Sequence, residues 1–248
     1  MSSLIIAHRG ASFYCPENTM AAFEMAFQQG ADGIETDVHL TADNIPVIIH
    51  DATIDRVSNY SGKVRSYSYE TLKTIDIGSW FNQDYQKETI LSLEDLLKWA
   101  RDKNLLINIE LKTSKESYPD IESIVYQLVY RYSMLDRVIF SSFNKATLQQ
   151  FKAIDAHCKI GLLRSRFDQQ VLMDAQQLKA DGIHLKYHAI NRKIVKDIRA
   201  ANMYLAPYTI NKSKQMRQCF SYNCAMIITD RPKLAIEKRY LYMNNRED

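Results

Sequence analysis

The chain has 248 residues, of which 46% are hydrophobic and 25% are charged, and its formal net charge at pH 7 is +3. This length suits one large hydrophobic core, and α/β barrels often reach it as a single domain. The small net charge gives no support for a nucleic-acid partner, although a slightly positive protein is compatible with an anionic substrate.

The sequence predicts a cytoplasmic protein, because it lacks the signals of other compartments. The N-terminus has no basic leader with an apolar stretch and a cleavage site, and no run approaches the roughly 20 apolar residues of a membrane span. We therefore expect no stable insertion into a membrane. Cys15, Cys158, Cys219 and Cys224 lack the paired spacing of metal ligands, so free buried thiols are expected.

Apolar runs that suit strands alternate along the chain with stretches of helical periodicity. The expected strands are residues 4–8, 33–38, 105–112, 137–143, 159–165, 182–187, 204–211 and 225–230. Among the helical stretches, residues 18–30 place Met20, Phe23 and Phe27 on one face, and Gly30 stands where the helix would end.

Eight strands alternating with helices predict an α/β fold, a (β/α)₈ TIM barrel. An open, doubly wound sheet is the alternative architecture. That fold would usually carry a glycine-rich phosphate loop after its first strand, and residues 7–16 do not form one.

One segment interrupts the alternation. Residues 39–51 predict a hairpin with a turn at Asp43 and Asn44. Residues from about 51 to 90 then lack clear helical periodicity, apart from a short piece at 67–75. Such a length is unusual for a loop in a compact domain. We therefore predict a single domain over residues 1–248, with a small insertion after the second strand.

Acidic residues follow the expected strands at the end where a barrel places its active site. Glu35 and Asp37 are two residues apart on one strand, so both point to the same face, and Glu110 lies at the end of the next barrel strand. Three converging carboxylates repel one another without a cation, and oxygen ligands suit Ca²⁺ or Mg²⁺ better than Zn²⁺. We expect these three residues to bind such an ion. The alternative is that Glu110 pairs with Lys112 and the other two hold an arginine.

His8 and His50 are the candidates for proton transfer. Both close apolar runs near these carboxylates, and histidine titrates near neutral pH, so one ring can accept a proton while another donates one. Asp51 follows His50 directly and is placed to orient it. For any one of these histidines, a purely structural role is the alternative.

Arg9 and Lys112 supply fixed positive charge at the same strand ends. Arginine binds phosphate through its planar fork and lysine as a point charge. With a divalent ion they suit a phosphodiester, which gains negative charge during displacement. The later strand ends add further polar candidates, namely Ser141 or Ser142, Arg164, Lys186, Tyr208 and Asn211.

These residues belong to motifs that closely resemble the signature of the glycerophosphodiester phosphodiesterase family. The motifs are HRG (8–10) with PENT (16–19), GADGIETDVHLTAD (30–43), VIIHD (47–51), Arg56, GSWF (78–81), SLEDLL (92–97), NIELK (108–112), SSF (141–143), YTIN (208–211) and IITDRP (227–232). The resemblance covers nearly the whole chain, in the family's order.

The resemblance implies a (β/α)₈ barrel that cleaves a small glycerophosphodiester to glycerol 3-phosphate and an alcohol such as choline or ethanolamine. It implies His8 and His50 as the acid–base pair and Arg9 and Lys112 as phosphate contacts. It also implies a Ca²⁺ or Mg²⁺ ion, with the three carboxylates named above as its ligands. The head group and the oligomeric state do not follow from it.

The nearest alternative function is a phospholipase D-type cut of lysophospholipids or sphingomyelin, which would require an apolar rim. The insertion does carry aromatic residues, namely Tyr60, Tyr67, Tyr69, Trp80, Phe81 and Tyr85, but we expect them to pack in a small core of its own. A barrel that only binds phosphorylated ligands is disfavoured, because every candidate histidine and carboxylate is present. An isomerase or aldolase would need a Schiff-base lysine or a late glycine-rich loop, and neither is evident.

Overall fold

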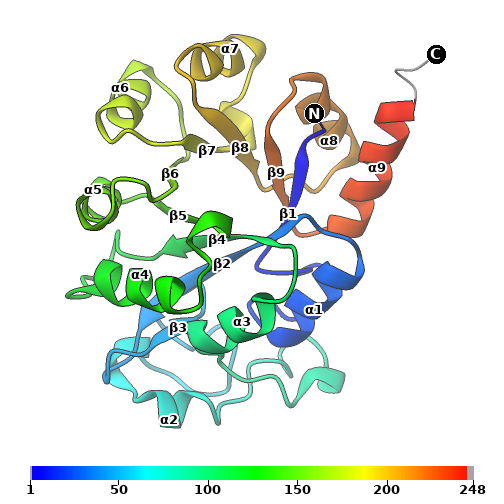
Figure 1. The fold of residues 1–248 in the computed structure, drawn as a ribbon. Coiled ribbons are helices and arrows are strands. Elements are labelled where there is room, and N and C mark those ends of the chain that lie inside the picture. Colours follow the sequence, from blue (N-terminus) through cyan, green and yellow to red (C-terminus); the bar gives the residue numbers. More distant parts are fainter. Residues whose placement is uncertain (1, 245–248) are drawn as a thin grey trace.

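The structure is a computed structural model, and it describes residues 2–244 of the chain. Within this range, eight parallel strands form a nearly closed barrel with helices packed around it (Figure 1), which confirms the predicted TIM barrel. These strands are β1 Leu4–His8, β2 Gly33–Leu40, β4 Leu106–Leu111, β5 Val138–Ser142, β6 Ile160–Arg164, β7 Gly182–Lys186, β8 Tyr204–Tyr208 and β9 Met226–Thr229.

The strands follow the order β8-β7-β6-β5-β4-β2-β1-β9, so the sheet is continuous from one end of the series to the other. Next to the gap between β8 and β9, Ile210 N donates a hydrogen bond of 2.9 Å to Ile228 O. A ninth strand, β3 Pro46–Ile48, pairs antiparallel with the outer end of β2. This is the predicted hairpin, and Asn44 adopts a positive φ of 58° in its turn.

Helices follow the strands and cover the outside of the barrel (Figure 1). They are α1 Met20–Gln28, α3 Leu93–Ala100, α4 Ile121–Arg131, α5 Lys145–Ile154, α6 Gln169–Gln177, α7 Arg192–Ala200, α8 Ser213–Ser221 and α9 Pro232–Asn244. Two of the first helices begin at caps that the sequence encodes locally. Thr19 accepts a hydrogen bond from Ala22 N, and Ser92 forms a capping box with Asp95.

The apolar side chains form three separate clusters. The largest lies between the strands and the helices, and a second fills the inside of the barrel with side chains such as Ile6, Ile139 and Ile228. The third belongs to the segment that follows β3, with Ile54, Leu72 and other aliphatic residues at its centre. The barrel is therefore a packed scaffold, and the insertion has a small core of its own.

The insertion contains the short helices η1 Val64–Ser66, α2 Tyr69–Leu72 and η2 Gln83–Tyr85. Tyr67 and Tyr69 pack against its aliphatic core, as expected. The expectation was wrong for three other aromatic residues, because Tyr60, Trp80 and Phe81 are 60%, 44% and 36% exposed. The aliphatic side chains already fill the small core, so these rings remain at its surface.

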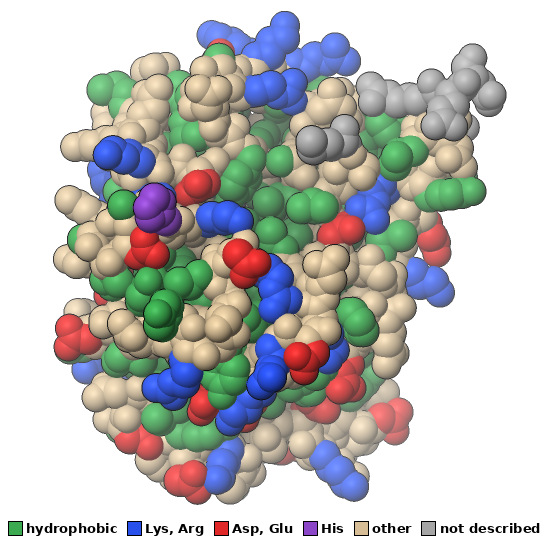
Figure 2. Space-filling model, viewed as in Figure 1, with side chains coloured by type: hydrophobic (Ala, Val, Ile, Leu, Met, Phe, Trp, Pro, Cys, Tyr) green, Lys and Arg blue, Asp and Glu red, His purple; other side chains and the backbone are tan. Residues whose placement is uncertain are grey.

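The surface carries its basic residues unevenly. Lys and Arg side chains gather over α7, whose sequence is RKIVKDIRA (Figure 2). The buried face of this helix is formed by Val195 and Ile198. Among the helices of residues 2–244, none combines the length and the apolar character needed to cross a bilayer. The four cysteines of this range are buried and free, as expected.

Two glycines make room for polar rings inside the barrel. A Cβ atom on Gly161 would lie 2.4 Å from His184 Nε2, and one on Gly182 would lie 2.2 Å from the Tyr204 ring. His184 Nε2 and the Tyr204 hydroxyl are 3.1 Å apart. The histidine is fully buried, and this burial lowers its pKa to about 3. It is therefore a neutral, structural residue.

This buried histidine predicts a pH-dependent stability. In the unfolded chain His184 takes up a proton near its ordinary pKa of 6.5, whereas in the folded protein it stays neutral down to about pH 3. The free energy of unfolding therefore falls as the pH drops through this window. Replacing His184→Gln should make this fall less steep in urea unfolding at pH 7 and pH 5. The control His157→Gln alters an exposed loop residue and should keep the wild-type slope. Equal slopes for wild type and His184→Gln would contradict the prediction.

Candidate active site

The pairing of the strands brings the predicted residues together at one end of the barrel. His8 at the end of β1 lies opposite Glu35 on β2, and Asp37 on β2 lies opposite Glu110 on β4. Because parallel strands end on the same side of the barrel, these side chains surround a single opening. Both predicted histidines line the same cavity there.

The three predicted carboxylates converge. One oxygen each from Glu35, Asp37 and Glu110 lies within 4.8 Å of the others, and all three side chains are almost fully buried. Burial and the Asp37 charge raise the pKa of Glu35 to about 8, and the same two causes raise the pKa of Glu110. Burial would also raise the pKa of Asp37, but the Lys112 and Arg9 cations hold it below its ordinary value. The cluster therefore combines one ionised carboxylate with two that resist ionisation.

Lys112 and Arg9 contact the acidic cluster directly. Lys112 Nζ lies 2.8 Å from Glu110 Oε1 and 3.1 Å from Asp37 Oδ1. Arg9 Nε lies 3.1 Å from Asp37 Oδ2, and the Arg9 backbone N–H donates a 3.0 Å hydrogen bond to Glu35 Oε2. The contacts of the alternative to ion binding considered above, Glu110 with Lys112 and an arginine beside the other two carboxylates, are thus present, and the three acids also converge.

The turn after β1 explains the spacing of HRG and PENT. Arg9 and Gly10 both adopt positive φ angles, of 55° and 79°. A Cβ atom on Gly10 would lie 2.6 Å from the backbone carbonyl carbon of Ala22, so only glycine fits this approach to α1. Asn18, with φ 59°, donates a 2.9 Å hydrogen bond to Asp37 Oδ2 and accepts one of 3.0 Å from Thr36. The loop therefore fixes an ionised carboxylate of the cluster.

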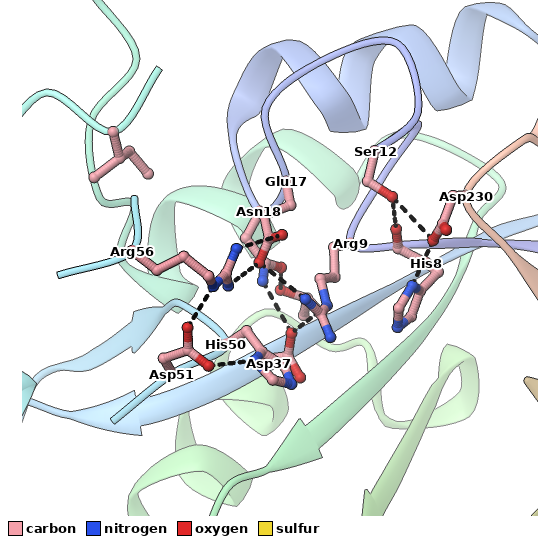
Figure 3. Close-up of polar contacts among 12 residues, drawn as sticks. His8, Arg9, Ser12, Glu17, Asn18, Asp37, His50, Asp51, Arg56 and Asp230 are labelled. Atoms are coloured by element: carbon pink, nitrogen blue, oxygen red, sulfur yellow. Dashed lines mark hydrogen bonds and ion pairs between the residues drawn. The ribbon is translucent and has the colours of Figure 1, made fainter. Parts of the chain in front are cut away.

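His8 is oriented by a carboxylate from the opposite end of the chain. Its Nδ1 atom lies 2.6 Å from Asp230 Oδ1, in the loop after β9, and its Nε2 atom lies 4.0 Å from Glu35 Oε2. Asn211 donates a hydrogen bond to Asp230 Oδ2. Ser12 donates one to Asp230 Oδ1 (Figure 3). Burial would lower the pKa of His8, but the hydrogen bond to Asp230 and the Glu35 charge raise it above the ordinary value. Sequence reasoning missed Asp230, although it follows the last strand.

His50 is oriented by its neighbour, as the sequence suggested. His50 Nδ1 lies 2.7 Å from Asp51 Oδ1, and Asp51 Oδ2 accepts a hydrogen bond from Arg56 Nε. Arg56 also contacts both oxygens of Glu17 through its two terminal nitrogens, at 3.0 and 2.7 Å. Glu17 in turn lies 2.9 Å from Arg9 Nη1 (Figure 3). Burial lowers the pKa of His50, and the Arg9 and Lys112 charges act in the same direction.

The other predicted rim residues differ in where they point. Lys186 and Tyr208 line the cavity, whereas Arg164 turns back to donate hydrogen bonds to the carbonyl groups of Phe143 and Leu163. Ser141 and Ser142 are fully buried. His188, in the short helix η4 Tyr187–Ala189, also lines the cavity, although the sequence analysis did not select it.

A central cavity of about 380 Å³ lies over the acidic cluster. Its walls come from nearly every strand end of the barrel. The lining residues are His8, Arg9, Glu35, His50, Asn108, Glu110, Lys112, Phe143, Leu163, Lys186, Tyr187, His188, Tyr208, Thr209, Gln215 and Ile228. One cavity is thus surrounded by a buried acidic cluster, two cationic side chains and two histidines that each contact a carboxylate. This combination is suited to an anionic ester.

Comparison with known proteins identifies the family. The model of the glycerophosphoryl diester phosphodiesterase family matches residues 8–234, which include every predicted site residue. The chain belongs to this family. A glycerophosphodiester phosphodiesterase from Caldanaerobacter subterraneus is 37% identical over 236 residues, which cover 95% of this chain and 97% of the relative. A second, from Bacillus altitudinis, is 36% identical over 95% of this chain and 97% of its own.

Solved structures agree with this assignment. A phosphodiesterase from Oleispira antarctica, in complex with the product sn-glycerol-3-phosphate, is 29% identical with a TM-score of 0.89 over 96% of each chain. A glycerophosphodiester phosphodiesterase from Agrobacterium tumefaciens is 28% identical with a TM-score of 0.83, over 95% of this chain and 99% of the other. The chain is therefore an enzyme, a glycerophosphodiester phosphodiesterase, and the relatives give no support to the phospholipase D alternative.

The contacts of Arg56 generate a prediction about this enzyme. Arg56 contacts both Asp51, which orients His50, and Glu17, which contacts Arg9. Loss of Arg56 should therefore displace His50 and Arg9. Arg56→Met and Arg56→Lys should each lower kcat/KM for a glycerophosphodiester by about 10- to 100-fold, because small displacements of catalytic groups have effects of that order. Added guanidinium should partly restore the activity of Arg56→Met.

Arg131→Met is the matched control. Arg131 forms a 3.9 Å ion pair with Glu94 on the outside of the barrel and should be dispensable for activity. If Arg56→Met folds and keeps the wild-type kcat/KM, the contacts of Arg56 with Asp51 and Glu17 have no effect on the site.

Proposed function

We propose that this phosphodiesterase hydrolyses glycerophosphodiesters to glycerol 3-phosphate and an alcohol, with a divalent cation and with His8 and His50 as the acid–base pair. The observation that carries the proposal is the convergence of Glu35, Asp37 and Glu110 in the cavity that both histidines line. We name glycerol 3-phosphate as a product because the Oleispira antarctica relative was solved in complex with its product sn-glycerol-3-phosphate.

The three carboxylates fit a cation such as Ca²⁺ or Mg²⁺. They offer oxygen ligands only, which these hard ions prefer, and the ligand atoms are close enough to share one ion. Burial and the charge of Asp37 raise the pKa of Glu35, and a bound cation would offset both effects by stabilising the ionised carboxylate. When bound, the cation would polarise the phosphoryl group and neutralise charge that develops on its oxygens.

Arg9 and Lys112 would contact the phosphate from the same side. Both lie at the acidic cluster and line the central cavity, and both are held in position by carboxylates. Because these partners already fix the two side chains, little reorganisation accompanies the growth of negative charge on the phosphoryl oxygens. Such pre-positioned charge lowers the barrier to phosphoryl displacement.

The two histidines would transfer protons at opposite sides of the phosphate. Each uses Nδ1 to contact a carboxylate, Asp230 for His8 and Asp51 for His50, which leaves Nε2 as the atom that can exchange a proton with the reactants. One ring would take the proton from the nucleophile, and the other would give a proton to the departing alkoxide. The nucleophile is either water or the 2-hydroxyl group of the glycerol half, which would first give a cyclic phosphate.

The histidine roles predict a large loss of activity. His8→Ala and His50→Ala should each lower kcat by about 10²- to 10⁴-fold, the usual contribution of a positioned acid or base. His184→Gln is the control, because that ring lies inside the barrel and contacts Tyr204. Retention of wild-type kcat by either alanine variant would remove that histidine from the mechanism. Single-turnover reactions of His50→Ala, analysed for a cyclic phosphate, distinguish the two nucleophiles.

The cation site predicts dependence on a divalent metal. Treatment with EDTA should abolish release of glycerol 3-phosphate, and adding Ca²⁺ or Mg²⁺ should restore it. The same ions should raise the melting temperature of the wild-type protein, since a ligand that binds only the folded state stabilises it. Asp37→Asn should show little of this thermal shift. Full activity after thorough chelation, together with an unchanged melting temperature in either ion, would contradict the proposal.

A further inference from the structure

One segment of the chain carries a large excess of positive charge. Between Gly182 and Thr229, from the start of β7 to the end of β9, there are eight Lys or Arg residues and one acidic residue, Asp197. This segment therefore has a formal charge of +7, and because the whole chain has +3, the remaining residues together have −4. Figure 2 shows Lys and Arg side chains gathered over α7. The positive charge of the enzyme is thus concentrated on one side of the barrel.

The basic side chains of α7 form a stripe on its outer face. Arg192, Lys196 and Arg199 have the spacing i, i+4 and i+7, so they lie one above the other, and Lys193 lies beside them. All four side chains are exposed, whereas the opposite face of the helix is buried against the barrel.

The outer face of α8 continues this stripe with Lys214 and Arg217, which are one turn apart and exposed. The two helices are connected, because Arg199 donates two 3.1 Å hydrogen bonds to backbone carbonyl groups just after α8. The Arg192 guanidinium group also lies 5.7 Å from the centre of the Tyr222 ring. We call the six cations of the two helices the basic face, namely Arg192, Lys193, Lys196, Arg199, Lys214 and Arg217.

The charges of the basic face are not neutralised inside the protein. Within residues 2–244, none of its six cations forms an ion pair, and Arg192 and Arg199 contact neutral groups. By contrast, every Lys and Arg of α4 and α5 has an acidic partner. These pairs are Arg131 with Glu94, Lys145 with Asp174 and Lys152 with Asp181. Like charges without partners repel one another, so an anionic surface would be attracted to the basic face.

The basic face extends to the mouth of the active site. Lys186, at the end of β7, and Lys212, just before α8, are exposed, and Lys186 lines the central cavity. Because each helix of a barrel begins near the end where the preceding strand finishes, Arg192, Lys193 and Lys214 lie toward the same end. A partner that covers the basic face would therefore lie next to the opening of the cavity.

The composition of the basic face favours a lipid surface over other polyanions. No large hydrophobic side chain of α7 or α8 is exposed. Proteins that bind single-stranded nucleic acid stack the bases on aromatic side chains, and protein interfaces usually have an apolar centre. The attraction between Lys or Arg side chains and anionic phospholipids requires neither.

We propose that the basic face adsorbs reversibly to membranes that contain anionic phospholipids, with the mouth of the barrel beside the bilayer. A glycerophosphodiester is what remains of a glycerophospholipid after both acyl chains are removed, so the enzyme would meet its substrate where that substrate is released. This advantage rests on the proposed function, whereas the adsorption itself does not. Because α7 and α8 expose no large apolar side chain that could insert, the attachment depends on charge and is screened by salt.

Sedimentation with vesicles tests the wild-type enzyme. Vesicles of equal parts phosphatidylglycerol and phosphatidylcholine should bind it at about 0.1 M NaCl, where the Debye length is about 10 Å. Vesicles of phosphatidylcholine alone should not. Binding should be lost at about 1 M NaCl, where the Debye length is about 3 Å. No binding to the anionic vesicles, equal binding to both kinds, or binding that persists at the higher salt would overturn the proposal.

A triple variant locates the binding surface. Lys193→Gln, Lys196→Gln and Arg217→Gln together remove three charges from the basic face. They should lower the partition coefficient on the anionic vesicles by about 100-fold, since each basic residue near such a surface contributes roughly fivefold. Without vesicles, this variant should keep the wild-type kcat/KM toward a soluble glycerophosphodiester, because none of the three residues lines the central cavity.

The matched control removes three exposed charges elsewhere. Lys73→Gln, Lys87→Gln and Lys98→Gln lie in the insertion and on α3, and together they should leave the partition coefficient close to that of the wild type. Equal losses in the two triple variants would mean that net charge alone governs binding, and would overturn the assignment to the basic face.

A competition experiment separates lipid from nucleic acid. Displacement of the enzyme from anionic vesicles by a single-stranded oligonucleotide, at the same concentration of phosphate groups, would assign the basic face to nucleic acid and overturn the lipid proposal. Continued binding to the vesicles supports it. Because vesicle binding is measured without substrate, an enzyme that binds vesicles but hydrolyses no glycerophosphodiester would reject the proposed function alone.

Discussion

The constraint on which the site depends is the burial of like charges. The register of β1, β2 and β4 places Glu35, Asp37 and Glu110 together at one end of the barrel, where all three are almost fully buried. The neighbouring side chains act against the resulting repulsion. Lys112 and Arg9 lie beside Asp37, and Asn18 donates to its second oxygen. Arg9 and Asn18, which belong to the motifs that follow β1, thus help to stabilise the buried acidic cluster in the folded protein.

The two histidines depend on different parts of the chain. His8 is held through Asp230 and Asn211, which both belong to the last part of the barrel. His50 is held through Asp51 and Arg56, which belong to the segment after β3. The two rings are therefore positioned independently, and the opposite directions of their pKa shifts reflect these different surroundings. The proposed acid–base pair would benefit from this asymmetry, because its two rings would move protons in opposite directions.

Much of the site could be predicted, because strand ends in a barrel share one rim. Glu35, Asp37 and Glu110 followed from the alternation of side chains along strands, and His50 with Asp51 followed from adjacency. Asp230, the partner of His8, could not be predicted, because it lies 222 residues away and periodicity carries no information on such contacts. The roles of Glu17 and Asn18 could not be predicted either, because they depend on loop geometry. The single-domain organisation and the cytoplasmic location stay predictions.

The carboxylate of Glu17 receives two guanidinium groups, one from the barrel and one from the insertion. The insertion has its own small apolar core, so it can open as a unit while the larger core stays intact. Such an opening would carry Arg56 away and release Asp51 from one of its partners. On heating, activity would then be lost at a lower temperature than the one at which the barrel unfolds. Better packing of the smaller core would raise the highest temperature at which the enzyme is active.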